Sequence, residues 1–374
     1  MIKAVIADDS PLLRQVLKDV LEKSKEIIVI GMALNGKAAI EIVKNKKPDI
    51  LILDCEMPVM NGLEALKIIM EENPLPVFVF SSHTFKSSIT TIRALELGAI
   101  DYLLKPSGGV AELEAISNEL ISKIKYVVAH GQLKIKAKGA TVDIDRKNIP
   151  TDINGVNTHL NTHPNTHINI NKSDSNNSLK DLKPRKFDIV AMGSSTGGVQ
   201  AATKIIPLLR ENLPPIVWVQ HMPEHFTASL AKRLNELSKI EVKEAENGEV
   251  IKRGTCYLAP GGHQMRVIKS ATGYKLQIAG EEKICGHCPS CTNLFESVAE
   301  HFTNNSLGLI LTGMGEDGST GLLDMHKRGA YIIGQNEKSC TVYGMPKAAF
   351  KIGAVDIELD LNMIADGINH LCIK

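Results

Sequence analysis

The stretch Phe187-Asp188-Ile189-Val190-Ala191-Met192-Gly193-Ser194-Ser195-Thr196-Gly197-Gly198 decides the fold of the second half of this chain. Its apolar run, 187–192, predicts a buried strand, and residues 200–209 predict a helix. The glycines between them permit a sharp strand-to-helix turn. Ser195 would then project above the edge of a sheet, as a nucleophile does. The loop alone fits a phosphate-binding cradle of backbone amides equally well.

Two later strand ends favour the nucleophile. The apolar run 216–219 ends at Gln220-His221, and the run 307–311 leads into Thr312-Gly313-Met314-Gly315-Glu316-Asp317. In a parallel sheet, Ser195, His221 and Asp317 all follow carboxyl ends and meet at one edge. A serine nucleophile, a histidine base and an aspartate that orients the imidazole require this convergence rather than a particular chain order. The order here differs from the Ser–Asp–His order of α/β-hydrolases, so we predict a separate doubly wound enzyme.

Neighbouring residues compete for these roles. Ser194 adjoins the predicted nucleophile but points elsewhere if the turn is an elbow. His225 opens a predicted helix, 225–237, where a capping or surface role is favoured over that of the base. Backbone amides are the expected donors to the oxyanion, with Thr196, which follows the nucleophile, as the first candidate and Met314 as the second.

The first 128 residues predict a smaller α/β unit. Short apolar runs alternate with amphipathic segments, and the predicted strands are 3–7, 28–33, 50–53, 77–81 and 102–104. Five strands alternating with five helices predict a doubly wound parallel sheet. Polar residues follow four of the strands: Asp8, Asp9, Asp54, Ser82 and Lys105.

These five residues would share the carboxyl edge of that sheet. Clustered carboxylates repel one another, and a divalent cation with oxygen ligands, Mg²⁺ above all, removes the conflict. A lysine and a hydroxyl beside them suit a phosphoryl group carried on a carboxylate. Acids after strands are also common turn and capping residues, but the complete set favours a phosphoryl site.

Composition separates the two units and limits the partners. Residues 129–184 are polar, repeat Asn-Thr-His at 157–159, 161–163 and 165–167, and predict a flexible low-complexity linker. We therefore expect domains at 1–128 and 185–374, the second with a β-rich insert of hairpins around 254–279.

The formal net charge of +1, from 43 basic and 42 acidic residues, indicates no nucleic-acid partner. We expect a cytoplasmic protein without membrane insertion, because no signal peptide or membrane-spanning run is visible. The seven cysteines, an odd number, also do not suggest the paired disulfide framework of a secreted protein.

The stretch Cys285-Gly286-His287-Cys288-Pro289-Ser290-Cys291 contains two overlapping Cys-x-x-Cys pairs. Such spacing suits zinc, with Cys256 or His287 as a fourth ligand, or a redox disulfide. Because the ligand set is incomplete, we favour small buried side chains in a loop over zinc at Cys285, Cys288 and Cys291.

The amino-terminal set resembles the receiver domain of two-component response regulators, which has a flavodoxin-like fold. The resemblance implies that Asp54 accepts a phosphoryl group from a chemotaxis histidine kinase. It also implies that Asp8, Asp9, Asp54 and the backbone carbonyl of Glu56 hold Mg²⁺, that Ser82 and Lys105 contact the phosphoryl oxygens, and that the Lys105–Pro106 bond is cis. Tyr102 falls at the position of a switching aromatic; a packed core tyrosine is the equal alternative.

The carboxy-terminal motifs resemble those of the chemotaxis protein-glutamate methylesterases. The motifs are Gly193–Gly198, Val219-Gln220-His221-Met222-Pro223, Leu311–Gly318 and Tyr343-Gly344-Met345-Pro346. The resemblance implies a Rossmann-like serine-hydrolase domain that hydrolyses glutamate γ-methyl esters on methyl-accepting chemotaxis receptors, with deamidation of glutamines as a second activity. It assigns Ser195, His221 and Asp317 as the catalytic residues, and the esterase reaction needs no cofactor.

Two other functions compete with this one. A non-catalytic response regulator, acting as a phosphorylation-dependent binding module, would carry its output in the second domain, but a DNA-binding version predicts a basic face that is not visible. A nucleotide-binding domain predicts an acidic residue at the end of the next strand, where this chain has Gln220-His221 instead.

Overall fold

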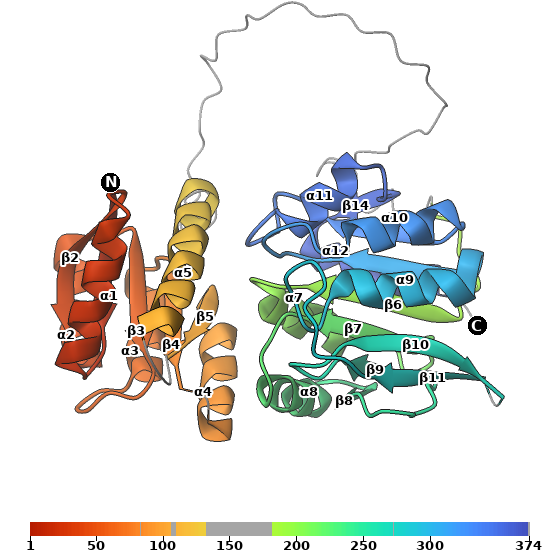
Figure 1. Ribbon diagram of the computed structural model, residues 1–374, viewed down its shortest axis with the longest axis horizontal. Helices are drawn as coiled ribbons and strands as arrows, with labels where there is room; N and C mark the ends of the chain where they lie inside the picture. Colours follow the sequence, from red (N-terminus) through yellow and green to blue (C-terminus); the bar gives the residue numbers. More distant parts are fainter. Residues whose placement is uncertain (83, 106–109, 132–181, 272, 373–374) are drawn as a thin grey trace, which may run out of the picture.

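A computed structural model describes residues 1–82, 84–105, 110–131, 182–271 and 273–372, which form two α/β domains side by side (Figure 1). The predicted linker, 129–184, lies almost entirely outside the described residues. Within the described parts of the chain, no helix combines the length and the apolar character that crossing a membrane requires.

The first domain alternates strands and helices throughout. Its elements are β1 (Ile2–Ala7), α1 (Pro11–Lys23), β2 (Ile27–Ala33), α2 (Gly36–Lys46), β3 (Ile50–Asp54), α3 (Gly62–Glu72), β4 (Val77–Ser81), α4 (Phe85–Glu96), β5 (Asp101–Leu104) and α5 (Val110–Gly131). The strands form one parallel sheet in the order β2-β1-β3-β4-β5. This order confirms the predicted doubly wound sheet, and it places Asp8, Asp54, Ser82 and Lys105 at one edge.

Local sequence explains where its helices begin. The Ser10 hydroxyl accepts a hydrogen bond from the Leu13 amide, and Pro11 occupies the first turn of α1. Helix α3 starts with a reciprocal capping box between Asn61 and Glu64. These caps satisfy amide groups that would otherwise lack partners.

The second domain is a larger sheet of the same kind. Its elements are β6 (Ile189–Ser194), α7 (Gly198–Ile205), β7 (Ile216–Gln220), α8 (Phe226–Leu237), β8 (Glu241–Glu244), β9 (Thr255–Leu258), β10 (Met265–Ser270), β11 (Gly273–Ile278), α9 (Cys291–Phe302), β12 (Ser306–Ile310), α10 (Ser319–Lys327), β13 (Tyr331–Gln335), α11 (Met345–Lys351), β14 (Ile357–Leu359) and α12 (Leu361–Leu371). Seven parallel strands follow the order β14-β13-β12-β6-β7-β9-β8. Strand β6 lies between β7 and β12, so the three predicted catalytic loops are neighbours.

Two predicted elements differ from the structure. Residues 255–258, expected in a hairpin, form β9, which pairs in parallel with β7, and only β10 and β11 form a hairpin. All four residues of β9 are buried, as in a strand covered on both faces of a parallel sheet. The helix expected over 200–209 begins at Gly198 and ends in a 3-10 turn, Ile206–Leu208, because Pro207 has no amide hydrogen to continue an α-helix.

The two domains contact each other directly. Helix α4 packs against α7 and α8, at the facing edges of the domains in Figure 1. The Arg233 guanidinium of α8 binds both carboxylate oxygens of Glu96, and the Ser88 and Ser229 hydroxyls are 2.7 Å apart. The side-chain amide of Gln200, in α7, donates to the backbone carbonyls of Leu95 and Ala99. The interface therefore joins the α4–β5 side of the first domain to the edge of the second sheet that carries Ser195.

Candidate active site

Ser195 sits in the strand-to-helix turn that its glycines predict. The residue follows β6 directly, and Gly197 has a φ of 80°, a left-handed conformation that favours glycine. The Ser195 amide donates to the Thr312 carbonyl, 3.1 Å away, and the Ser195 carbonyl accepts from the Gly198 amide. A Cβ on Gly313 would approach the Ser195 Cβ to 2.9 Å, so the Thr312–Gly313 loop closes tightly on the serine.

Ser194 has a different role from its neighbour. It is fully buried, accepts a hydrogen bond from the Trp218 indole and donates to the Gln220 side-chain carbonyl. The Gln220 amide then donates to the backbone carbonyls of Ser195 (3.0 Å) and His221 (3.3 Å). Gln220 thus links the ends of β6 and β7 immediately beside both predicted catalytic residues. Ser194 faces this buried network, as expected if the turn is an elbow.

His221 and Asp317 form the predicted pair. The His221 Nε2 atom lies 2.8 Å from Asp317 Oδ2, and the other ring nitrogen, Nδ1, is buried without a hydrogen-bond partner. If Nε2 carries the hydrogen of this bond, Nδ1 keeps the lone pair and is the nitrogen free to accept a proton from serine. Ser195 and His221 line the same cavity, of about 630 Å³.

The amino end of α9 holds Asp317 in place. Its carboxylate accepts hydrogen bonds from the Ser290 hydroxyl and from the backbone amides of Cys291 and Thr292. Burial alone would raise the pKa of Asp317, but the hydrogen bond and charge of His221, with these donors, hold that pKa well below its usual range. Asp317 is therefore a carboxylate at every pH at which the protein would work.

The two oxyanion candidates border the same cavity. Thr196 and Met314 both line it, as Ser195 does. The Thr196 hydroxyl donates to Asp101 of the first domain, 2.7 Å away. Lys123 of α5 also contacts Asp101, at 2.9 Å. The cavity is consequently shared: the β5 residues 101–104 and Lys123 form the wall that faces the serine.

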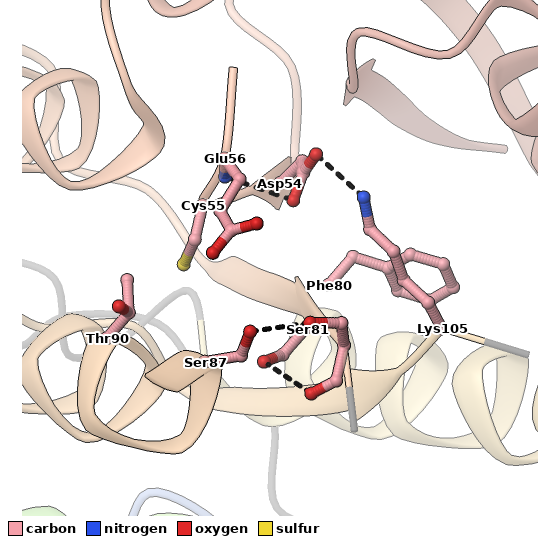
Figure 2. A pocket seen from close by; sticks show the side chains of 9 residues that line it. Asp54, Cys55, Glu56, Phe80, Ser81, Ser87, Thr90 and Lys105 are labelled. Carbon is pink, nitrogen blue, oxygen red and sulfur yellow. Dashed lines mark hydrogen bonds and ion pairs between the residues drawn. The ribbon is translucent and has the colours of Figure 1, made fainter. Parts of the chain in front are cut away.

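The predicted phosphoryl site is a separate pocket of the first domain (Figure 2). Lys105 Nζ lies 2.9 Å from Asp8 Oδ2 and 2.7 Å from Asp54 Oδ2. Ser82 lines the same pocket, and its hydroxyl is 2.5 Å from that of Ser87 in α4. Burial raises the pKa of Asp54 to about 6, and the hydrogen bond and charge of Lys105 oppose this rise.

This pocket fits the predicted magnesium ligands. Carboxylate oxygens of Asp8, Asp9 and Asp54 lie within 4.8 Å of one another, with Asp8 and Asp54 buried and Asp9 exposed. Two buried carboxylates share one lysine, which leaves an excess of negative charge that a hard divalent cation would neutralise. The predicted cis bond after Lys105 leads to Pro106, which lies outside the described residues.

The structure also describes Tyr102, His225 and the cysteines before α9. Tyr102 is a buried tyrosine whose ring stacks on Phe226 of α8 at 5.0 Å, so it contacts the second domain rather than only its own core. His225 is exposed and makes no side-chain cap to α8. The prediction of small buried thiols is wrong for Cys285, which is exposed, and for Cys288, which is half-buried.

The three thiols also diverge. Cys285 approaches Thr292, Cys288 approaches the Gly280 carbonyl, and Cys291 lies 3.7 Å from His221 Nε2. Among the residues whose positions are described, two groups bring three ligand atoms within 4.8 Å, and neither includes Cys285 or Cys288.

Three residues at the site were not predicted: Gln220, Asp101 and His287. Gln220 directly precedes His221, and Asp101 directly precedes Tyr102, so adjacency to a predicted residue was the available signal. The sequence suggests His287 only as a zinc ligand, whereas its ring stacks on that of His221.

The fold and the two sites define a class of protein: an α/β serine hydrolase joined to an α/β domain with a phosphoryl-acceptor pocket. Residues 190–368 match the CheB methylesterase family, and residues 4–117 match the response regulator receiver domain. A protein-glutamate methylesterase/protein-glutamine glutaminase of Halalkalibacterium halodurans is 38% identical over 99% of this chain and 98% of its own length. The protein of the same name from Bacillus subtilis is 39% identical over 100% of this chain and 99% of its own.

A solved structure, the CheB methylesterase catalytic domain of Thermotoga maritima, is 37% identical and covers 50% of this chain and all of its own, with a TM-score of 0.49. From the two full-length matches, this chain belongs to the protein-glutamate methylesterase/protein-glutamine glutaminase family, with an amino-terminal receiver domain and a carboxy-terminal methylesterase domain.

Proposed function

We propose that this protein hydrolyses glutamate γ-methyl esters on methyl-accepting chemotaxis receptors, and that it deamidates receptor glutamines by the same chemistry. The observation that carries the proposal is the meeting of Ser195 with the His221–Asp317 pair at one cavity, in a chain related over its whole length to enzymes of that name. Both reactions are acyl transfers through a tetrahedral oxyanion, so one site serves both.

Each residue has a defined part in the chemistry. His221 Nδ1 takes the proton of the Ser195 hydroxyl as its oxygen attacks the side-chain carbonyl. The resulting imidazolium is stabilised by Asp317, which is already ionised. The Thr196 amide, with Met314 as the second candidate, donates to the oxyanion. His221 then returns the proton to the leaving methanol or ammonia, and water repeats the sequence on the acyl-enzyme.

The receiver domain supplies the control. Asp54 is the proposed phosphoryl acceptor from a chemotaxis histidine kinase, and Ser82 and Lys105 would contact the phosphoryl oxygens. Asp8, Asp9, Asp54 and the Glu56 carbonyl would hold Mg²⁺, which neutralises charge on the phosphoryl group when bound. The alternative of a non-catalytic binding module is not favoured, because it leaves the His221–Asp317 pair without a role.

The contacts between the domains support inhibition by the docked receiver. Its residues Asp101–Leu104 wall the cavity, and Asp101 holds Thr196, the first oxyanion candidate. In this proposal, the wall keeps a receptor helix away from Ser195. The pocket of Asp54 connects with the interface through the first turn of α4: Ser87 contacts Ser82, and the next residue, Ser88, contacts Ser229 of α8. Phosphorylation would shift the population toward an undocked form if the phosphoryl group favours that form energetically.

Methanol release from methylated receptor membranes tests the proposal. The full chain is assayed with Mg²⁺, with and without a small-molecule phosphodonor, beside Asp54→Ala and Ser195→Ala. We expect release that the donor stimulates in the wild type alone and that Ser195→Ala abolishes. Methanol release that is the same with and without the phosphodonor would support the esterase activity and contradict its control by phosphorylation. No release from folded protein would contradict the esterase activity itself.

Two further proposals concern the location of the protein in the cell and the binding of zinc. We place it in the cytoplasm, where the signalling ends of such receptors and the kinase would be accessible. Zinc at Cys285, Cys288 and Cys291 stays unfavoured, and metal quantitation on purified protein tests it: one equivalent of zinc would overturn that view.

A further inference from the structure

The loop that precedes α9 has a geometry that brings a second histidine to the active site. Ile284 and His287 exchange two backbone hydrogen bonds, each of 3.0 Å, across a tight turn. The two residues inside the turn, Cys285 and Gly286, have φ values of 51° and 82°, as a two-residue hairpin turn requires. The turn therefore sets the position of His287 at its exit.

His287 meets the face of the predicted base. The centroids of the His287 and His221 rings are 3.7 Å apart, and the ring planes differ by 10°. His287 also lines the cavity of Ser195, and the Gln264 side-chain amide donates to its backbone carbonyl, 3.0 Å away. One face of the His221 imidazole is thereby covered by a ring whose backbone is anchored on both sides.

The same segment fixes the other partner of the base. Ser290, Cys291 and Thr292, three to five residues after His287, supply the donors that hold the Asp317 carboxylate. Residues 284–292, which we term the base-holding segment, thus contact the imidazole through its face and the carboxylate through its oxygens. Two independent contacts converge on the group that must accept the serine proton.

We propose that His287 is a positioning residue, whose ring holds the plane of the His221 imidazole in line with Ser195. This proposal rests on the proposed function of Ser195, His221 and Asp317. The hydrogen bond between Nε2 and Asp317 leaves the imidazole free to tilt about that contact, and the stacked ring prevents the tilt. His287 acts through His221 and exchanges no proton with the substrate.

The charge state of His287 is compatible with this task. Burial, with the neighbouring His221, lowers the pKa of His287 to about 4, and the charge of Asp317 only partly opposes this. Lys123 and Lys283 also act to lower it. The ring is consequently neutral at pH 7, so a stacked partner does not repel the imidazolium that His221 becomes during the reaction.

Replacing the ring in two ways separates stacking from imidazole chemistry. His287→Ala removes the stacked ring, whereas His287→Phe keeps an aromatic face and no nitrogen. His263→Ala is the matched control, because His263 is a part-exposed histidine of the same domain that does not line the cavity. Thermal unfolding of all variants identifies any that fail to fold.

The first readout is labelling of Ser195 by a fluorophosphonate in the phosphodonor-treated full chain. The serine oxygen forms a bond to phosphorus, fluoride leaves, and His221 accepts the serine proton, so the rate reports the nucleophile and base without the receptor substrate. We expect His287→Ala to slow labelling about 10- to 100-fold, the effect of a misplacement of about 1 Å, and His287→Phe to recover most of the rate. In methanol release, kcat should fall by the same factor with KM unchanged.

Labelling of His287→Ala at the wild-type rate would overturn the proposal, as would His287→Phe being as slow as His287→Ala. If wild-type protein is labelled but releases no methanol, the proposed hydrolysis of receptor methyl esters is wrong. The labelling rates of the variants still test the positioning role of His287. If wild-type protein is not labelled, nuclear magnetic resonance of the His221 ring decides. A change in its proton shifts in His287→Ala, but not in His263→Ala, supports the stack, and unchanged shifts overturn it.

Discussion

Gln200 offers the sharpest test of how the receiver restrains the esterase. Its side-chain amide, on α7, donates to the Leu95 carbonyl at 3.1 Å and to the Ala99 carbonyl, both in the receiver. Gln200→Ala removes both donors and leaves a good helix former in α7. In the undocked form the two carbonyls regain water, so the substitution weakens docking more than it weakens either domain.

The expected size follows from these two contacts. A neutral hydrogen bond contributes about 0.5–1.5 kcal/mol net, so the pair contributes about 1–3 kcal/mol to docking. A change of that size corresponds to about 5- to 150-fold in the ratio of undocked to docked protein. While the docked form predominates, activity without phosphodonor should rise by the same factor, up to the activity of the fully phosphorylated protein.

Methanol release from methylated receptors, measured without phosphodonor, is the assay. Gln15→Ala is the matched control, since Gln15 is also a helical glutamine but bonds to Asp19 within its own helix. Activity at saturating phosphodonor should be the same in both variants and the wild type. If Gln200→Ala has the basal activity of Gln15→Ala, the docked arrangement does not limit the enzyme and the inhibition argument is wrong.

The remaining predictions concern the catalytic site and the receiver. Ser195→Ala should lower kcat by a factor on the order of 10⁶, as in comparable triads. Methanol release at close to the wild-type rate would contradict the assignment of Ser195 as the nucleophile. Gln220→Met, which removes the donors to the Ser195 and His221 carbonyls, should lower kcat about 100-fold and leave KM unchanged; a changed KM with constant kcat would argue against positioning. Asp317→Asn should destabilise the protein at pH 7 in urea unfolding, because a carboxyl with a lowered pKa contributes stability above the unfolded pKa of about 3.9, and this contribution is lost as the pH falls through the folded pKa. The difference from wild type should therefore narrow below about pH 4. Chelation of Mg²⁺ should remove the stimulation by phosphodonor and spare the basal activity, and stimulation that survives chelation would exclude the metal from phosphorylation.

Strand ends were the most reliable guide to both sites. The apolar runs before Asp8, Asp54, Ser195 and His221 are buried strands, and parallel pairing carries the residue after each run to the same edge of its sheet. A short buried run with a polar residue behind it is a local feature, so it can be read without knowing which strands are neighbours.

Local patterns misled where a segment's neighbours decide its structure. Residues 255–258 suggested a hairpin because short runs near glycines resemble one, yet β9 pairs with β7, some 40 residues earlier in the chain. The Cys285–Cys291 stretch suggested small buried thiols in a loop, yet Cys285 is exposed and Cys288 is half-buried. The structure separates those thiols and uses the histidine between them and the amides after them at the active site.

The sequence by itself determined the two α/β domains, the catalytic and phosphoryl-site residues as candidates, and the family they resemble. Hydrophobic periodicity, glycine turns and polar strand ends are properties of a few consecutive residues, and these suffice to set each element. Only the tertiary structure placed His287 on His221, the Gln220 side chain on the Ser195 carbonyl, and Asp101 on Thr196. The residues in these contacts are 25 to 95 positions apart in the sequence, and some lie on loops whose conformation depends on tertiary packing. No pattern of a few consecutive residues can predict such contacts.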